Sequence, residues 1–498
     1  MKRLLVANRG EIAVRVARTA REMGMTTVAV HAANDAAAPH VRACDLAVSL
    51  GDGPPAETYL STERLLRAAR DSGADAVHPG YGFLSESPAF ARAVGSAGLV
   101  WVGPPPSAME EMGGKLRSRA RMEAAGVPVV PGSPPGADAR GLAAAAERIG
   151  YPLLVKASAG GGGKGMSRVD RPEDLAAALA EGSRLAEAAF GDGTVYLERL
   201  LEHSRHVEFQ VFGDGAGHVV HLFERECSVQ RRHQKIVEET PSTALTAERR
   251  RAMGEAAVAA ARAVGYVSAG TVEFLVAPDG RFYFLEMNTR LQVEHPITEA
   301  TLGVDLVRAQ LEVASGAPLP AAWRDGRLAP RGHAIELRLY AEDPETFLPR
   351  TGRLLAWREP EGPGIRVDSG VQEGSRVGVE YDPLLAKLTV SAESRDAAIA
   401  RAKRALSEWI VLGVETNLPL LRAVLDAPEF ASGGYDTGIV ERLPPRRRPE
   451  PPDAAWIAAA LAAAGPGAVP GRGIPDSAQP GAGGRDPWDA AGCWRPGA

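Results

Sequence analysis

One predicted β-hairpin constrains the fold of this chain more than any other segment, because its register brings two carboxylates face to face. The runs 271–276 and 281–288 are rich in β-branched and aromatic residues, and the Pro-Asp-Gly sequence between them is typical of a turn. A two-residue Asp-Gly loop pairs Glu273 with Glu286 and puts Asn288 on the same face. Directly opposed like charges destabilise a sheet unless a cation lies between them.

The oxygen-bearing side chains on this face predict a divalent cation site. Carboxylate and amide oxygens suit Mg²⁺ or Mn²⁺, with substrate phosphates completing the coordination. The alternative is an edge hairpin whose acids are solvated. A three-residue loop would favour that alternative, because it shifts the register and turns one acid to the opposite face.

The residues that follow the hairpin extend this polar cluster. In an extended chain Arg290, Gln292 and Glu294 point to the same side as the hairpin acids, because side chains alternate with period two. Pro296 biases His295 toward extended conformations, so we expect a non-helical run here. A cation site, a guanidinium and a further carboxylate on one face indicate phosphate chemistry with a general base.

Size and composition exclude several classes of protein. A chain of 498 residues is too long for one hydrophobic core and predicts roughly three domains. A net charge of −5 argues against a protein devoted to nucleic acid. Three widely separated cysteines suggest neither a disulfide framework nor a thiolate metal site. Since no apolar run suits a signal peptide or a membrane span, we expect a cytoplasmic protein without a membrane partner.

The order of strand-like and helix-like segments predicts a multidomain protein of the α/β and α+β classes. Strand and helix patterns alternate up to about residue 112, as in a parallel, Rossmann-like sheet. The first turn carries the single glycine Gly10, which disfavours dinucleotide binding and a nicotinamide oxidoreductase. The predicted divisions are a Rossmann-like domain at 1–112, a second domain at 113–322, a mixed α+β domain at 333–442 and a Pro/Gly-rich tail, expected to be a linker or disordered, at 443–498.

A glycine-rich loop follows the predicted strand 151–156. Lys156 and Lys164 border a run of glycines whose backbone amides can fold around phosphate oxygens. The run fails the P-loop pattern, and no helix opens directly after it as a dinucleotide fingerprint requires. We interpret it as a phosphate-binding lid, and an exposed loop without function is the alternative.

A cationic stretch lies at 230–235. On a β pattern Arg231, His233 and Lys235 share one face, and this density of positive charge requires an anion or carboxylate partner. A salt-bridged surface is the alternative. Lys115 and Arg338 are unremarkable when each is taken singly.

Taken together, five motifs resemble the biotin carboxylase family of ATP-grasp ligases over about residues 1–442. They are Ala7-Asn-Arg-Gly-Glu-Ile12, His78-Pro-Gly-Tyr-Gly-Phe-Leu-Ser-Glu86, Lys156-Ala-Ser with its glycine run, Gln230-Arg-Arg-His-Gln-Lys235 and Glu286-Met-Asn-Thr-Arg-Leu-Gln-Val-Glu-His-Pro296. The resemblance implies that 113–322 is an ATP-grasp domain, with its lid at about 128–202, and that 333–442 is the family's C-terminal domain. It also implies ATP-dependent carboxylation of biotin through carboxyphosphate, with Mg²⁺ or Mn²⁺ as cofactor.

The resemblance assigns a role to each candidate residue. The implied metal ligands are Glu273, Glu286 and Asn288. The implied ATP contacts are Lys115, Lys156, Gly162, Gly163, Glu198, Arg199, Leu200, Leu201, His206, His233, Glu273 and Glu286. The implied bicarbonate contacts are Lys235, Arg290, Gln292, Val293 and Glu294, with Glu294 as the base that removes the proton. The implied biotin contacts are Tyr81 and Arg338, and Arg338 would stabilise charge on the ureido oxygen. The catalytic set is therefore Glu294, Arg290, Lys235 and Arg338.

The departures from the family pattern are mild and concern nucleotide affinity. Arg199 and Lys164 stand where lysine and arginine are common, and Ala159 shortens the glycine run by one. The chain has no Ala/Val-Met-Lys-Met biotinylation sequence. We therefore expect a homodimer that works with a separate biotin carboxyl carrier protein and a carboxyltransferase β-subunit in an acetyl-, propionyl- or methylcrotonyl-CoA-type carboxylase. The alternatives are another ATP-grasp carboxylate–amine ligase and a non-catalytic, nucleotide-responsive assembly subunit.

Overall fold

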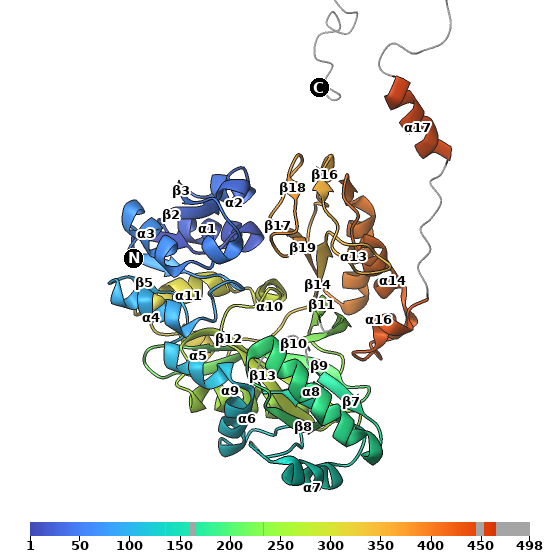
Figure 1. Cartoon of the computed structure of the whole chain (residues 1–498). Coiled ribbons are helices and arrows are strands. Elements are labelled where there is room, and N and C mark those ends of the chain that lie inside the picture. The colour runs from blue at the N-terminus through green and yellow to red at the C-terminus, as the bar shows by residue number, and fades with distance from the viewer. Residues whose placement is uncertain (135, 159–165, 233, 445–452, 465–498) are drawn as a thin grey trace, which may run out of the picture. The chain divides into compact units, whose positions relative to one another are not determined.

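The computed structural model describes most of the chain (Figure 1): residues 1–134, 136–158, 166–232, 234–444 and 453–464. Residues up to Arg446 form one compact unit, and the chain from Arg447 onward forms a second. Within the described ranges, none of the helices combines the length and apolar character that a bilayer crossing requires.

The N-terminal layer is a parallel sheet with the strand order β3-β2-β1-β4-β5, which confirms the Rossmann-like prediction. Leu4 of its central strand packs in a core with Ile12 of α1, and Leu5 packs on the other side with Leu65 of α3. Burial on both faces explains the continuous apolar run of that strand. The prediction omitted β3, an edge strand with mostly exposed side chains. The elements are β1 (Arg3–Val6), α1 (Gly10–Glu22), β2 (Thr26–Ala32), α2 (Pro39–Ala43), β3 (Leu46–Gly51), α3 (Thr62–Ser72), β4 (Ala76–His78), α4 (Pro88–Ser96), β5 (Val100–Trp101) and α5 (Pro106–Gly113).

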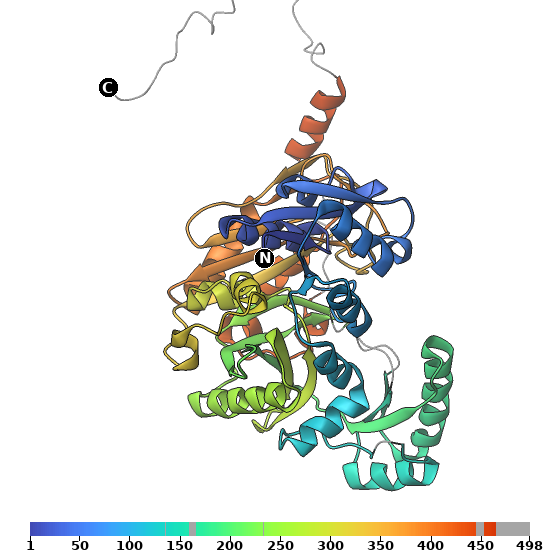
Figure 2. The ribbon, with the colours of Figure 1, turned by 90° about the vertical axis from the view of Figure 1, so that its left-hand side faces the viewer.

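A small antiparallel sheet, in the order β7-β6-β8, carries the predicted lid. Figure 2 shows α7 and α8, in the blue-green part of the colour range, packed against it, and Leu142 and Leu175 share its core with Leu153. The glycine run between β6 and β7 lies outside the described residues. The elements are α6 (Lys115–Ala124), α7 (Ala139–Ile149), β6 (Leu153–Ala157), β7 (Met166–Val169), α8 (Leu175–Phe190) and β8 (Val195–Arg199).

An eight-stranded antiparallel sheet forms the centre of the unit, in the order β13-β12-β9-β10-β11-β14-β19-β17. It continues across the predicted domain division between residues 322 and 333. Its strands are β9 (Arg205–Gly213), β10 (Val219–Arg231), β11 (Gln234–Thr240), β12 (Ser268–Val276), β13 (Phe282–Asn288), β14 (His333–Tyr340), β17 (Ile365–Ser369) and β19 (Leu384–Ala392).

Helices and short strands complete this unit. The helices are α9 (Ala247–Ala263), α10 (His295–Leu302), α11 (Leu306–Ala314), α12 (Ala321–Arg324), α13 (Arg395–Glu408), α14 (Leu418–Asp426), α15 (Pro428–Ser432) and α16 (Ile439–Arg442). The short strands are β15 (Gly352–Arg353), β16 (Ala356–Arg358), β18 (Arg376–Val377) and β20 (Ile410–Leu412). In the tail, which we expected to be linker or disordered, the structure forms helix α17 (Asp453–Ala464), because alanine is the strongest helix former.

Candidate functional site

The β12–β13 hairpin pairs Glu273 with Glu286, as the sequence predicts, but by a different route. Val276 pairs with Phe282 around a loop that is one residue longer than expected. A β-bulge at Leu285 then restores the register, so that both acids face the same side. The predicted pairing is confirmed, although the predicted two-residue loop is wrong.

Glu273 is buried at the centre of a charged network. Its Oε1 accepts hydrogen bonds from Lys235 Nζ at 2.7 Å, Asn288 Nδ2 at 2.8 Å and Gln292 Nε2 at 3.1 Å. Its Oε2 lies 2.8 Å from His206 Nε2. Burial opposes ionisation, but the charges of Lys235 and His206 outweigh it and hold the pKa of Glu273 well below its ordinary value.

The residue Glu286 is exposed, and its side chain makes no hydrogen bond or ion pair with the described residues. Desolvation by the surrounding protein and the like charge of Glu273 raise its pKa. These two carboxylates and Asn288 form a set of hard oxygen donors on one face, and this set fits Mg²⁺ or Mn²⁺. His206, Glu208 and Glu273 also offer ligand atoms within 4.8 Å of one another.

Lys235 joins three buried carboxylates. Its Nζ lies 2.5 Å from Glu208 Oε2, 2.7 Å from Glu273 Oε1 and 2.9 Å from Glu294 Oε1. Burial lowers the pKa of Lys235, but the three acids raise it well above its ordinary value. The lysine is therefore a fixed positive charge at this point.

Glu294 is fully buried between two cations. Lys235 holds its Oε1, and Arg338 Nη2 donates to its Oε2 at 2.8 Å. Arg338 Nε also donates to Glu238 Oε1 at 2.6 Å. Although burial raises the pKa of Glu294, Lys235 and Arg338 lower it well below its ordinary value. The ionised form of Glu294 is thus favoured while both cations hold it.

After β13 the chain bends at Arg290 and turns at residues 293–294, so the predicted extended run is wrong, although residues 289–294 are non-helical as expected. Helix α10 begins at His295, with Pro296 in its first turn, where a missing backbone N–H costs no helical hydrogen bond. The residue before the proline therefore enters a helix after all. A turn, rather than strand alternation, brings the side chains of this segment together.

Arg290 lies at a bend before that turn and bonds several of its neighbours. Its Nη1 donates to Gln292 Oε1 at 2.6 Å, and its Nη2 donates to Asn288 Oδ1 at 2.7 Å. Its Nε donates to Glu86 Oε2 at 3.0 Å. The structure thus gathers the predicted bicarbonate residues beside the hairpin acids.

The cationic stretch does not share one face, because a turn interrupts the strand. Arg231 ends β10 and pairs with Gln234 at the start of β11, so Lys235 lies opposite Gln230. Arg231 Nη2 contacts Glu342, whereas Lys235 points to the acids described above. His233 lies outside the described residues.

Lys156, Glu198 and Lys115 are predicted nucleotide contacts that lie on the small sheet and on α6. Lys156 Nζ donates to Glu198 Oε2 at 2.6 Å, and Arg119 Nη1 donates to Glu198 Oε1 at 3.3 Å. Desolvation and the neighbouring charge of Lys156 lower the pKa of Lys115, which begins α6. Lys115 and Lys156 are near enough for their charges to interact, and two such lysines predict an anionic partner.

The remaining predicted nucleotide and biotin contacts differ in how deeply they are buried. Arg199 ends β8 and is exposed, whereas Leu200 and Leu201 follow it and are partly buried. The Tyr81 hydroxyl is buried without a hydrogen-bond partner among the described residues. Gly162 and Gly163 lie outside the described residues.

Sequence reasoning missed several charged residues of the network. Glu208, Arg225 and Glu238 are fully buried, and Arg225 Nε donates to Glu208 Oε1 at 2.5 Å. The sequence did carry a signal for Glu208, because the polar residues His206, Glu208 and Gln210 alternate with apolar residues along β9. For Glu238 no local pattern distinguished a site residue from an ordinary surface acid.

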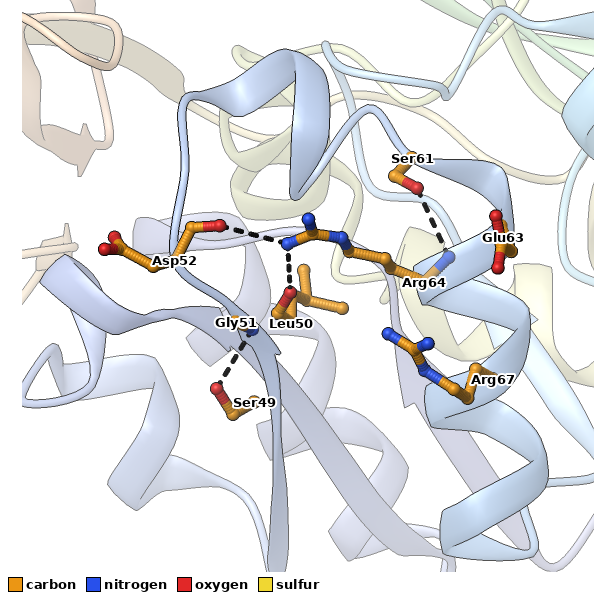
Figure 3. A pocket seen from close by; sticks show the side chains of 8 residues that line it. All are labelled: Ser49, Leu50, Gly51, Asp52, Ser61, Glu63, Arg64 and Arg67. Atoms are coloured by element: carbon orange, nitrogen blue, oxygen red, sulfur yellow. Dashed lines mark hydrogen bonds between the residues drawn. The ribbon is translucent and has the colours of Figure 1, made fainter.

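A cavity of about 610 Å³ lies away from this network, between β3 and α3 (Figure 3). Its lining includes Arg64, whose Nη1 donates to the carbonyl oxygens of Leu50 at 2.7 Å and Asp52 at 3.1 Å. Because the Arg64 guanidinium hydrogen-bonds backbone carbonyl groups at the end of β3 and just after it, this side chain stabilises the backbone of that segment. None of the predicted site residues lines the cavity.

Family models match three consecutive parts of the chain. They are the biotin carboxylase N-terminal domain over residues 1–109, the ATP-binding domain of the carbamoyl-phosphate synthase L chain over 114–322, and the biotin carboxylase C-terminal domain over 336–442.

Curated relatives and solved structures agree with these matches. The chain is 48% identical to a biotin carboxylase of Halalkalibacterium halodurans, over 88% of this chain and 97% of that protein. It is 51% identical to the α-subunit of a mitochondrial methylcrotonoyl-CoA carboxylase of Oryza sativa, over 89% of this chain but only 60% of that protein. The biotin carboxylase domain of a Hydrogenobacter thermophilus 2-oxoglutarate carboxylase, solved as a dimer with MgADP and bicarbonate, superposes with a TM-score of 0.84 at 44% identity, over 88% of this chain and 97% of that one.

Proposed function

This chain belongs to the biotin carboxylase family of ATP-dependent ligases, and we propose that the charged network is where it carboxylates biotin with ATP and bicarbonate. One observation carries the proposal: the Glu294 carboxylate is held between Lys235 and Arg338 beside the hairpin acids. A base, an anion-binding cation and a metal-fitting donor set therefore lie within one cluster.

Glu273, Glu286 and Asn288 would hold Mg²⁺ or Mn²⁺. When bound, the metal neutralises the phosphate charges of ATP. Lys115, Lys156 and the lid amides of Gly162 and Gly163 would bind those phosphates. The adenine and ribose would contact Glu198, Arg199, Leu200, Leu201, His206 and His233.

Bicarbonate would lie against Lys235, Arg290, Gln292 and the backbone of Val293. Glu294 then removes its proton, so that the anion attacks the γ-phosphoryl group and carboxyphosphate forms. An incoming anion shares the charge of Lys235 and so weakens its hold on Glu294. The pKa of Glu294 rises as a result, which makes the carboxylate a better base once bicarbonate is bound.

Arg338 and Tyr81 would contact biotin. Arg338 stabilises the negative charge that develops on the ureido oxygen when the ring nitrogen loses its proton. Carboxyphosphate releases CO₂ and phosphate, and the phosphate takes that proton. A closed lid keeps water from the labile intermediate.

The test is ATP cleavage measured with and without bicarbonate, and then with free biotin added. We expect cleavage to require bicarbonate and to increase with biotin, with carboxybiotin as product. Cleavage driven by a different carboxylate, without bicarbonate, would support the carboxylate–amine ligase instead. Nucleotide binding without turnover in any of these conditions would support the non-catalytic subunit.

We further propose that the chain works in the cytoplasm as a homodimer, within an acyl-CoA carboxylase that has a separate biotin carboxyl carrier protein and a carboxyltransferase β-subunit. The chain resembles relatives named biotin carboxylase and methylcrotonoyl-CoA carboxylase subunit α, and these names support a role in a carboxylase of this kind. Co-purification from the native cell would identify both partners and the acyl-CoA. Full acyl-CoA carboxylation by this chain and the β-subunit alone would refute the separate carrier.

A further inference from the structure

One face of the sheet formed by β11, β14, β19 and β17 is charged, although it is buried. Val237, Leu337 and Leu388 lie on the opposite face in an apolar core. Helices α10 and α1 cover the charged face. Its buried residues alternate with the apolar ones along the strands: Glu238, Glu336, Arg338, Lys387, Thr389 and Asp368.

Two cations are directly opposed on this face. Arg338 of β14 pairs with Lys387 of β19, and their exposed fractions are 7% and 0%. Opposed like charges destabilise a sheet, and burial increases that cost. Such a pair persists only when other groups compensate both charges.

The two cations hold consecutive residues of one segment. Arg338 Nη2 donates to the side chain of Glu294, and Lys387 Nζ donates to the backbone carbonyl of Val293. Lys387 therefore holds the peptide that links Val293 to Glu294, while Arg338 holds the carboxylate that follows it. Hydrogen bonds from ionised donors are the stronger kind, so this peptide has little freedom to rotate.

One counter-charge of Lys387 lies in the N-terminal layer, in addition to Asp368, which is opposite Lys387 in the sheet. The Nζ of Lys387 lies 3.8 Å from Glu11 Oε1, and Glu11 begins α1. Both carboxylate oxygens of Glu11 are buried without a hydrogen bond among the described residues. Burial raises the pKa of Glu11 to about 7 despite the opposing charge of Lys387. The Lys387 ammonium also lies 5.9 Å from the ring centroid of Tyr81, the predicted biotin contact.

We propose that Lys387 is a positioning residue of the carboxylation site, which clamps the Val293–Glu294 peptide together with Arg338. The clamp aims the Glu294 carboxylate and the Val293 backbone at bicarbonate. This inference rests on the proposed function, because it takes Glu294 as the base.

The test compares variants of the full chain in steady-state ATP cleavage with bicarbonate and free biotin. Lys387→Met keeps the length of the side chain but removes the ammonium. We expect kcat to fall about tenfold to hundredfold, the cost of a misplaced reacting group, with an unchanged KM for ATP. Lys387→Gln, whose amide still donates one hydrogen bond to Val293, recovers part of kcat. Lys403→Met is the matched control, since Lys403 pairs with Asp426 at the surface, and it retains wild-type kcat.

A second variant separates positioning from folding, because Lys387→Met leaves Glu11 without its counter-charge. The double variant Glu11→Gln/Lys387→Met removes both charges, so we expect its melting temperature to recover while kcat stays low. Wild-type kcat in Lys387→Met, or recovered kcat in the double variant, would overturn the inference. Wild-type protein that lacks bicarbonate-dependent, biotin-stimulated ATP cleavage would instead overturn the proposed function.

Discussion

Replacing Glu294 by glutamine separates proton removal from nucleotide binding. The change keeps the shape of the side chain but removes the charge that Lys235 and Arg338 hold at 2.9 and 2.8 Å. General-base catalysis contributes roughly 10²- to 10⁴-fold to a rate. At about 1.4 kcal/mol for each factor of ten, the barrier rises by about 3–5 kcal/mol.

Glu294→Gln costs less stability than removing one partner from most buried ion pairs does. Removing one partner of a buried pair costs about 3–5 kcal/mol when it leaves a charge uncompensated. Here Lys235 keeps Glu208 and Glu273, and Arg338 keeps Glu238. We therefore expect a loss on the order of 2 kcal/mol, the net value of a charged hydrogen bond.

The assay follows ADP release at saturating ATP, with bicarbonate present or absent, and measures nucleotide affinity by calorimetry. We expect bicarbonate-dependent turnover of Glu294→Gln to be lost while ATP affinity stays the same. The matched control is Glu299→Gln on α10, the helix that begins directly after Glu294; Glu299 is a buried acid that pairs with Arg15 and Arg366 at 2.8 Å each. Equal turnover in the two variants would refute the assignment of Glu294 as the base.

Three further predictions address the metal site, pH dependence and the core. Glu286→Gln raises the Mg²⁺ or Mn²⁺ concentration required for half-maximal ATP cleavage, which a metal titration measures; an unchanged requirement contradicts the metal role. Burial lowers the pKa of His78 to about 4, so the unfolded state binds a proton on this histidine first as pH falls from 6.5, and the contribution of His78 to stability falls by about 1.4 kcal/mol per pH unit. Urea unfolding at pH 7 and pH 5 measures this slope, and His78→Gln, which does not titrate, reduces it. Leu421→Ala in the C-terminal core costs about 2–5 kcal/mol in urea unfolding, with turnover retained.

Sequence patterns predicted the two strands of the β12–β13 hairpin well because side chains in a strand alternate with period two. They predicted turns less well. The hairpin between β12 and β13 has a longer loop than expected, and the bulge at Leu285 corrects the register. Between β10 and β11 the turn at Arg232, whose φ is +48°, separates Arg231 from Lys235. Adding or removing one residue in a turn moves every following side chain of the strand to the opposite face of the sheet.

The sequence by itself determined the parallel N-terminal layer, the opposed pair Glu273 and Glu286, and the family to which the chain belongs. All three depend on residues close together in the chain, where periodicity and motif spacing are visible. Only the tertiary structure decided which cations meet which acids. Glu208, Lys235, Glu294 and Arg338 come from four separate elements, and the strand order that joins them results from packing across the whole sheet.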